Sequence, residues 1–584
     1  MFPWHALSLF ALQLGLRSYQ ILCLAQQKAL PPQVWSQWPW LLWSDLTAAI
    51  FVGLIWDWWE PAWTTRFPAA SRTRARIFGI FFTCLVGYLG FSFQFYSYFN
   101  DFFNYGFWTQ IDRLSSYWKT LGQEISWGTL AGTAACLAYA WSTRAAARHR
   151  PSRGKSTQAV RATGLVLVLV WSLGFSPWGH ALPPANWQAL DKNPLIELLS
   201  FITPEPAARA ARRINPDTAK LPHLSFVRRL PPTERQNMSV LLLILESTTP
   251  EYAGLTRAVP AGLTPNLTRL GAASLMFTNH YCQEPATLKS WYSLLTGRYS
   301  YATRRWRDFI LRAKPDLSLP EILKTHGYRS LFLTSSNGRT YSQNEFLQGR
   351  FDEVLDRQRL KKRYPGWREY SDCLDDRVLP GALDDFLQHT AEKKFFAVVS
   401  PYFPHHPYDL PDPAFQVNAG NTDFARYQSS LHFADALVGQ LTEVLAKNGR
   451  AENTLLVIVS DHGEAFRQHP GNTLHSVYLY EENVRTLFLL HNPRLLQPGR
   501  LSSLTRHIDV LPTILDLLGY ASPGCDGESV VTLSPPRTAF FYTTFSDPRY
   551  GLRSGAWKYL LNRRSGAEEL DNMETDPNET RNRA

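Results

Sequence analysis

The chain has 584 residues, carries a formal net charge of +11 and is 45% hydrophobic. This length exceeds that of one ordinary domain, and the sequence has no internal repeat and no long low-complexity tract, which excludes repeat and fibrous proteins. The positive charge is not accompanied by an arginine–aromatic pattern, so we expect no nucleic-acid partner.

Residues 1–182 are rich in Leu, Phe, Trp and Ala, unlike the rest of the chain. Several segments within them approach the ~20 residues that a helical membrane span requires. These segments are residues 5–24, 41–59, 77–98, 126–142 and 160–180. We therefore predict that residues 1–182 form a transmembrane domain of about five helices.

Lysine and arginine are distributed unevenly over the predicted loops. Residues 60–76 contain four arginines and residues 143–161 contain five arginines and one lysine, whereas residues 25–40 and 99–125 are poor in both. Because basic loops stay in the cytoplasm, this pattern places the N-terminus inside and everything after about residue 183 outside. The predicted location is the cell (inner) membrane, crossed several times, with the C-terminal part extracytoplasmic.

Residues 183–236 are rich in Pro, Ala and Arg and are expected to form a connector. Beyond them, buried-strand patterns alternate with helical patterns. The strands are expected at residues 240–245, 329–334, 395–400, 455–459 and 486–490, and the helices at 266–273, 319–326, 377–389, 424–447 and 507–518. This alternation predicts an α/β domain over residues 237–584, with a mostly parallel sheet, helices on both faces and a C-terminal subregion at 520–584.

Three of the six cysteines lie in this exported part, namely Cys282, Cys373 and Cys525. The sequence has no CxxC pattern for a metal site. An oxidising compartment would allow one disulfide, and the sequence does not identify its partners.

Acidic residues follow two of the predicted strands. Glu246 comes directly after the first strand, and Asp461 and His462 follow the strand at 455–459. Open α/β sheets place their sites at the carboxyl ends of strands, so the two acids could meet at one edge. Two carboxylates and an imidazole suit a divalent metal ion. From these residues alone, an aspartate that caps a helix beside a surface histidine is an equal alternative.

The segment 284–298 supplies a candidate nucleophile. Thr287 would begin a helix that runs into an apolar stretch, and helix N-terminal amides and a metal ion both favour an alkoxide and a bound anion. The plain alternative is that Thr287 serves only as the N-cap of that helix.

Several further motifs occur in a fixed order over residues 240–582. They are Leu-Leu-Thr-Gly-Arg at 294–298, Ser-Asp-His-Gly-Glu at 460–464, Tyr-Glu-Glu-Asn-Val-Arg at 480–485, His-Ile-Asp-Val-Leu-Pro-Thr-Ile-Leu-Asp-Leu-Leu-Gly at 507–519, Trp-Lys-Tyr at 557–559 and Asp-Pro-Asn-Glu at 576–579. In this combination the chain resembles the sulfatase branch of the alkaline phosphatase superfamily. That resemblance implies the sulfatase-like α/β fold.

Two departures from the sulfatase pattern narrow the resemblance. The family's nucleophile precedes the Leu-Leu-Thr-Gly-Arg block by seven residues, which gives Thr287 here, whereas a formylglycine sulfatase has Cys or Ser in Cys-x-Pro-x-Arg. Where sulfatases typically have two adjacent aspartates, this chain has Glu246 and Ser247. With the five predicted spans, these features resemble membrane-bound lipoteichoic acid synthases and lipid A phosphoethanolamine transferases.

This narrower resemblance implies a reaction and a metal site. Glu246, Thr287, Asp461 and His462 would bind one divalent ion, Mn or Zn. Thr287 would take a phosphoalcohol group from a phospholipid donor and pass it to an extracytoplasmic glycan or lipid acceptor. His405 and His475 match histidines that would bind the transferred group, with His406 and His469 as alternatives. From its position two residues past Thr287, Lys289 could also contact a phosphate, and a solvated lysine is an equal alternative. Asn337 follows a predicted strand and could line the substrate pocket.

Two rival functions use the same residues. The first is a sulfuric- or phosphoric-ester hydrolase of the sulfatase family, in which water is the acceptor. The second is a non-enzymatic lipid sensor that keeps the fold, and the presence of all the implied metal ligands argues against it.

The predicted topology can be tested with reporter fusions. A reporter joined after residue 190 should be active outside the cytoplasm, and one joined near residue 70 should be active inside, because the basic loops set the orientation. A cytoplasmic reporter at residue 190 would refute five spans.

Overall fold

The computed structural model describes residues 225–584, apart from residues 229, 304–305, 338–342, 371, 391–392, 533–536 and 546. The predicted transmembrane domain, residues 1–182, and most of the predicted connector lie outside the described residues. Within the described ranges, no helix has the length and apolar character needed to cross a membrane.

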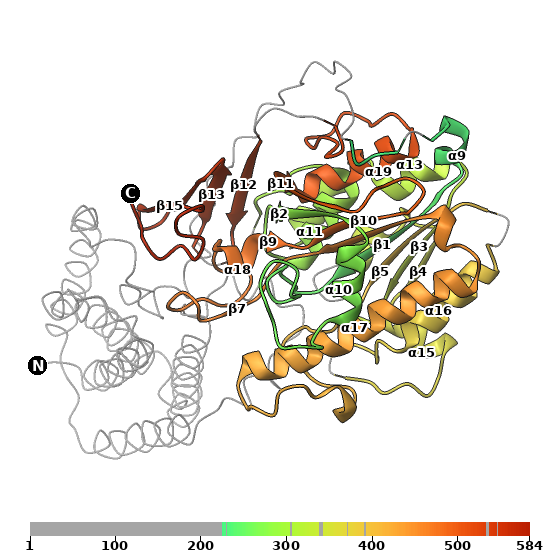
Figure 1. Ribbon diagram of the computed structural model, residues 1–584, viewed down its shortest axis with the longest axis horizontal. Coiled ribbons are helices and arrows are strands. Elements are labelled where there is room, and N and C mark those ends of the chain that lie inside the picture. Colours follow the sequence, from blue (N-terminus) through green and yellow to red (C-terminus); the bar gives the residue numbers. More distant parts are fainter. Residues whose placement is uncertain are drawn as a thin grey trace, which may run out of the picture.

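A nine-stranded sheet forms the centre of the described domain (Figure 1). Its strand order is β11-β2-β10-β6-β1-β5-β3-β4, with β9 pairing β2. The strands are β1 (Ser239–Leu245), β2 (Leu275–Tyr281), β3 (Arg329–Thr334), β4 (Glu353–Leu355), β5 (Phe395–Ser400), β6 (Thr454–Ser460), β9 (Arg485–Thr486), β10 (Phe488–His491) and β11 (Gly499–Arg506). Strands β9 and β10 run antiparallel to their neighbours, so the sheet is mixed, and the α/β class is confirmed.

Helices cover both faces of this sheet (Figure 1). They are α9 (Pro232–Gln236), α10 (Pro265–Ala272), α11 (Thr287–Thr296), α12 (Trp306–Ala313), α13 (Leu319–Thr325), α14 (Gln343–Leu347), α15 (Arg357–Arg363), α16 (Val378–Gln388), α17 (Asp423–Lys447), α18 (Glu481–Val484) and α19 (Val510–Leu518). One apolar core packs α11, α13 and α19 on the sheet, and a second packs α10, α16 and α17 on the opposite face.

Strand β1 illustrates why the centre of the sheet is apolar throughout. All of its residues are buried, and alternate side chains enter opposite cores, with Leu242 in one and Leu243 in the other. Strands covered on both faces need continuous apolar runs, and each fully buried Leu contributes roughly 1.5–3 kcal/mol relative to an exposed one.

The register of two central strands brings the predicted acids together. Strands β1 and β6 are parallel, and Leu245 pairs with Ser460. Glu246 and Asp461 each follow these paired residues directly. Because neighbouring strands lie about 4.8 Å apart, the two carboxylates emerge side by side at the carboxyl edge.

A second, four-stranded antiparallel sheet ends the chain. It consists of β12 (Thr538–Thr543), β13 (Arg549–Ser554), β14 (Trp557–Asn562) and β15 (Ala567–Asn572). The side chain of Lys558 on β14 is fully buried, and its Nζ lies 3.0 Å from an oxygen of Glu481 and 2.8 Å from an oxygen of Glu579. This ion-pair group fastens the second sheet to α18. The three described cysteines are free.

A short ribbon after the Ser-Asp-His-Gly-Glu motif is also fastened to the C-terminal tail. It pairs β7 (Ala465–Phe466) with β8 (Thr473–Leu474). In the loop between them, His469 Nδ1 lies 2.7 Å from Glu482 Oε1, and its Nε2 lies 3.1 Å from the Glu579 carbonyl. Burial opposes protonation of His469, but the hydrogen bond and the charge of Glu482 outweigh it and raise the pKa to about 9.

This pKa leads to a pH dependence of stability. The folded chain holds a proton on His469 that the unfolded chain releases above about pH 6.5, so the contribution is complete below about pH 6.5 and is lost as the pH rises through 9. The loss should be roughly 1–3 kcal/mol, discounted for partial exposure. Denaturant unfolding across this range should show a shallower pH slope for His469→Gln than for the wild type, and equal slopes would contradict the assignment.

Candidate active site

The predicted metal ligands lie around one point. Ligand atoms of Glu246, Asp461 and His462 all lie within 4.8 Å of one another, and the three residues are buried. His462 Nε2 is 3.6 Å from Glu246 Oε1 and 3.3 Å from Asp461 Oδ2. The hydroxyl of Thr287 lies 3.2 Å from the same nitrogen. Two carboxylates, an imidazole and a hydroxyl therefore converge.

Helix α11 positions the hydroxyl. The N-cap is Ala286, which is extended and makes no side-chain cap bond, so Thr287 is the first helical residue and the N-cap alternative is wrong. Ser290 donates a 2.6 Å hydrogen bond to the Asp461 carbonyl, which ties the first turn of α11 to the end of β6. The positive end of the helix dipole thus lies beside the carboxylates.

The hydrogen bonds of Asp461 leave one oxygen for a cation. Its Oδ1 accepts from the backbone N–H of Ser247 at 3.0 Å and from that of His462 at 2.7 Å. Its Oδ2 is buried and has no hydrogen-bond partner. Leaving a buried carboxylate oxygen without a partner is costly, and a metal ion at this position would remove that cost.

The electrostatics of the cluster agree with this interpretation. Burial, and then the neighbouring Asp461 carboxylate, raise the pKa of Glu246 well above its usual range. Burial lowers the pKa of His462 to about 4, so its ring is neutral. Its Nδ1 lies 3.0 Å from the Gly463 carbonyl and carries the proton, which leaves the lone pair of Nε2 facing the carboxylates. This donor set fits Mn or Zn.

Gly463 allows the motif to pack. A Cβ added there would lie 2.1 Å from the Glu482 carbonyl oxygen, which is far closer than atoms can approach. The motif therefore requires glycine between His462 and Glu464.

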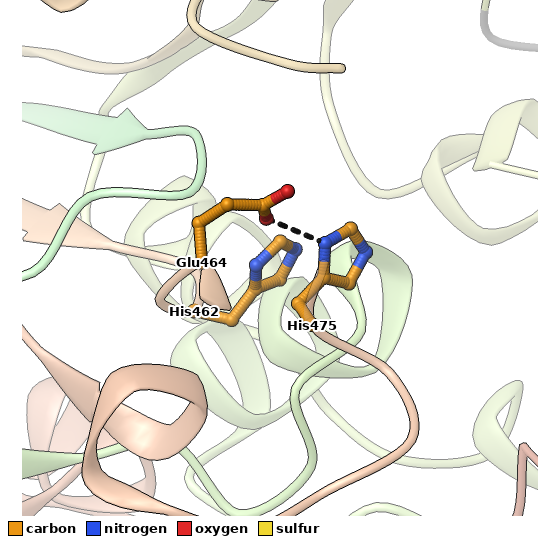
Figure 2. A group of neighbouring side chains, drawn as sticks. All are labelled: His462, Glu464 and His475. Carbon is orange, nitrogen blue, oxygen red and sulfur yellow. Dashed lines mark hydrogen bonds and ion pairs between the residues drawn. The ribbon is translucent and has the colours of Figure 1, made fainter. Parts of the chain in front are cut away.

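Glu464, to which the sequence analysis gave no role, is bonded to three donors. Its Oε1 accepts from the Tyr408 hydroxyl at 2.6 Å, and its Oε2 lies 3.0 Å from Ser247 Oγ and 2.9 Å from His475 Nδ1. Figure 2 shows this last contact beside His462. Ligand atoms of His462, Glu464 and His475 also lie within 4.8 Å of one another.

This second group does not have the geometry of a metal site. The rings of His462 and His475 are stacked, with centroids 3.9 Å apart and planes 24° apart. Imidazole lone pairs lie in the ring plane, so two stacked rings cannot direct them at one ion. The group of His462, Glu464 and His475 therefore forms a hydrogen-bonded support beside the first cluster.

The structure places the two predicted histidines in a row with His462. The centroid of His405 lies 6.4 Å from that of His475, and His405 Nδ1 is 2.6 Å from the His406 carbonyl. Of the alternatives, the His406 ring packs on Tyr408, and His469 is bonded to Glu482 and the C-terminal tail.

The other two predicted substrate contacts are less directly placed. Lys289 is buried, and its Nζ lies 2.6 Å from Glu284 Oε1 and 3.0 Å from the Thr303 carbonyl. Its ammonium is thus used inside the protein, and a role in substrate binding stays a prediction. Asn337 lies just beyond β3 at the carboxyl edge, buried, with its side-chain oxygen unbonded. Its role also stays a prediction.

Comparison with known proteins identifies the family. Residues 239–520 match the sulfatase family model. This segment belongs to the sulfatase family. The match supports the sulfatase-like branch that the motifs of this segment predict.

Named relatives of the sulfatase domain match only part of their length. The chain is 26% identical over 313 residues to an ulvan-active sulfatase from Formosa agariphila, which covers 46% of this chain and 60% of that protein. It is 27% identical over 177 residues to arylsulfatase K from Mus musculus, which covers 27% of this chain and 32% of that protein.

One solved structure with a similar fold is the lipoteichoic acid synthase LtaP from Listeria monocytogenes. It has 18% sequence identity and a TM-score of 0.49, and the match covers 61% of this chain and 89% of that one. At this level the likeness says nothing about activity.

The metal site can be tested by removing single ligands. Glu246→Gln and Asp461→Asn should each lower metal affinity by at least about tenfold, because each replaces a charged ligand without changing its size. Metal content of the dialysed protein, measured by mass spectrometry, should fall in both variants.

A matched control is Asp384→Asn, which removes a carboxylate paired with the exposed Lys447. Its metal content should equal that of the wild type. Wild-type metal content in both ligand variants would contradict the site.

Proposed function

We propose that this protein is a membrane-bound, metal-dependent phosphotransferase that moves a phosphoalcohol group from a phospholipid to an extracytoplasmic glycan or lipid through Thr287. The observation that carries the proposal is the hydroxyl of Thr287 at the first position of α11, 3.2 Å from His462 Nε2. Oxidation of Cys or Ser gives the aldehyde of a formylglycine. The methyl group on the Thr287 Cβ rules out that aldehyde, so the side chain acts as a hydroxyl nucleophile.

Glu246, Asp461 and His462 would hold the divalent ion beside Thr287. When bound, that ion supplies positive charge that lowers the pKa of the hydroxyl and neutralises charge on the phosphoryl oxygens. The first-turn amides of α11 add partial positive charge on the same side. Phosphoryl transfer depends mainly on such positioning and charge neutralisation.

The proposed reaction has two transfer steps. In the first, a bond forms between Thr287 Oγ1 and phosphorus while the bond from phosphorus to the lipid glycerol oxygen breaks, and the proton lost by Thr287 ends on diacylglycerol. In the second, an acceptor hydroxyl attacks phosphorus, the bond to Thr287 breaks, and Thr287 regains a proton from the acceptor. Nε2 of His405 and of His475 carries these protons, since Nδ1 of each ring is engaged elsewhere.

The apolar segments within residues 1–182 support a membrane location, because a phospholipid donor requires the site to work near headgroups. An ester hydrolase is the second candidate function. The names of the relatives favour it, since these proteins are sulfatases. Product analysis separates the two, because a transferase leaves the group on an acceptor and a hydrolase releases free phosphoalcohol or sulfate.

The nucleophile gives the sharpest test. Thr287→Ala should abolish turnover, and Thr287→Ser should retain part of it, because a primary hydroxyl can still attack. With phosphatidylethanolamine supplied and no acceptor, mass spectrometry should find one added head group on the peptide that contains Thr287.

Ser290→Ala is the matched control, because the Ser290 hydroxyl is three residues along the same helix and donates to a backbone carbonyl. This variant should keep the adduct. Turnover of Thr287→Ala at the wild-type rate would show that the covalent mechanism is wrong.

A further inference from the structure

The carboxylate of Glu464 is fully enclosed and fully bonded. Its side chain is buried. Its Oε1 accepts a hydrogen bond from the Tyr408 hydroxyl at 2.6 Å, and its Oε2 lies 3.0 Å from Ser247 Oγ and 2.9 Å from His475 Nδ1. With these three donors, Glu464 has little capacity left for a metal ion. Because a carboxylate accepts these hydrogen bonds, the contacts determine which atoms of the neighbouring side chains carry a hydrogen.

For His475 this contact fixes the tautomer. An ionised carboxylate only accepts hydrogen bonds, so the Nδ1 of His475 must carry a hydrogen. Its Nε2 then carries the lone pair. Stacking on His462 at 3.9 Å fixes the plane of the ring, so the two contacts together leave His475 one orientation (Figure 2).

The serine that follows Glu246 connects this support to the metal ligands. Ser247 Oγ lies 2.9 Å from Glu246 Oε1 and 3.0 Å from Glu464 Oε2. A hydroxyl has one hydrogen, so it donates to one of these carboxylates at a time. The position where sulfatases typically have a second aspartate thus contacts Glu464.

We propose that Glu464 is a positioning residue that holds His475 in the orientation and tautomer in which the Nε2 lone pair can accept a hydrogen bond from a P–OH group, or accept the proton of the attacking hydroxyl and pass it to the leaving oxygen. Glu464 does not touch the substrate, and it acts through the ring of His475, much as a buried aspartate orients a catalytic histidine. This inference rests on the proposed role of His475 at the site.

A double-mutant cycle tests the coupling. Glu464→Ala should lower kcat/KM for bis-p-nitrophenyl phosphate by about a hundredfold, similar to the loss in His475→Ala, because the ring is no longer held. In the His475→Ala background, Glu464→Ala should cost less than about threefold more. Glu464→Gln should recover at least about tenfold of the loss, since its carbonyl can still accept the Nδ1 hydrogen.

Two controls separate positioning from general support. Tyr408→Phe removes a hydrogen bond to the same carboxylate without touching His475, and it should change kcat/KM by less than about threefold. Metal content should be unchanged in Glu464→Ala. Additive losses in the double variant, or loss of metal from Glu464→Ala, would overturn the proposal.

Phosphate binding gives a second measurement that needs no turnover. Inorganic phosphate titrated into the metal-loaded full chain should bind about tenfold more weakly to Glu464→Ala than to the wild type, and no more weakly to the double variant than to His475→Ala. Equal binding to the wild type and Glu464→Ala, or no binding to the wild type, would refute it. Neither the double-mutant cycle nor phosphate binding depends on which molecule accepts the transferred group. If the protein proved to be a hydrolase without a Thr287 adduct, the proposed function would be wrong, but the role of Glu464 would be unaffected.

Discussion

Two buried carboxylates placed side by side are the constraint on which the rest of the site depends. The pairing of Leu245 with Ser460 forces Glu246 and Asp461 together at the edge of the sheet. Burial, and then the charge of Asp461, raise the pKa of Glu246, so the site disfavours a negative charge on that carboxyl. A divalent cation bound between them would offset this cost, and His462 and Thr287 lie where they could complete its ligands. The apolar strands beneath hold the carboxylates in place, because both faces of β1 and β6 are covered.

Three histidines in the site have the same hydrogen-bonding arrangement. In His462, His405 and His475, Nδ1 is bonded to a carbonyl or carboxylate oxygen, and Nε2 is left for chemistry. The group that accepts the Nδ1 hydrogen bond differs among the three rings. His462 and His405 use backbone carbonyls, whose positions the fold fixes, whereas His475 depends on a side chain. His475 is therefore the ring whose orientation a single substitution elsewhere can change.

The sequence predicted the centre of this structure well and its margins poorly. The apolar runs at 240–245 and 455–459 correspond to β1 and β6 within a residue at either end, because fully buried strands have a distinct composition. Strands β2 and β11 were not predicted, since Leu275–Tyr281 and Gly499–Arg506 mix polar and apolar residues. Strand β11 is an edge strand, and β2 lies next to it. The predicted strand at 486–490 is divided into β9 and β10.

The same distinction holds for the site. Glu246, Asp461 and His462 could be found because each directly follows a recognisable strand. The place of Glu464 in the hydrogen-bond network could not, although it belongs to the same motif. That place depends on Tyr408, 56 residues away in the chain, and on Ser247, 217 residues away. Lys289 shows the opposite case, because a lysine near a nucleophile suggested a phosphate contact, and its burial against Glu284 was not readable from the sequence.

The hydrogen bond from Ser290 to the Asp461 carbonyl has a consequence for motion. It joins the helix that carries the hydroxyl to the strand that carries the carboxylates, so these elements shift together when the domain fluctuates. Little relative motion is then left between the Thr287 hydroxyl and the two carboxylates. A molecule that enters this site therefore meets groups whose mutual positions are already set.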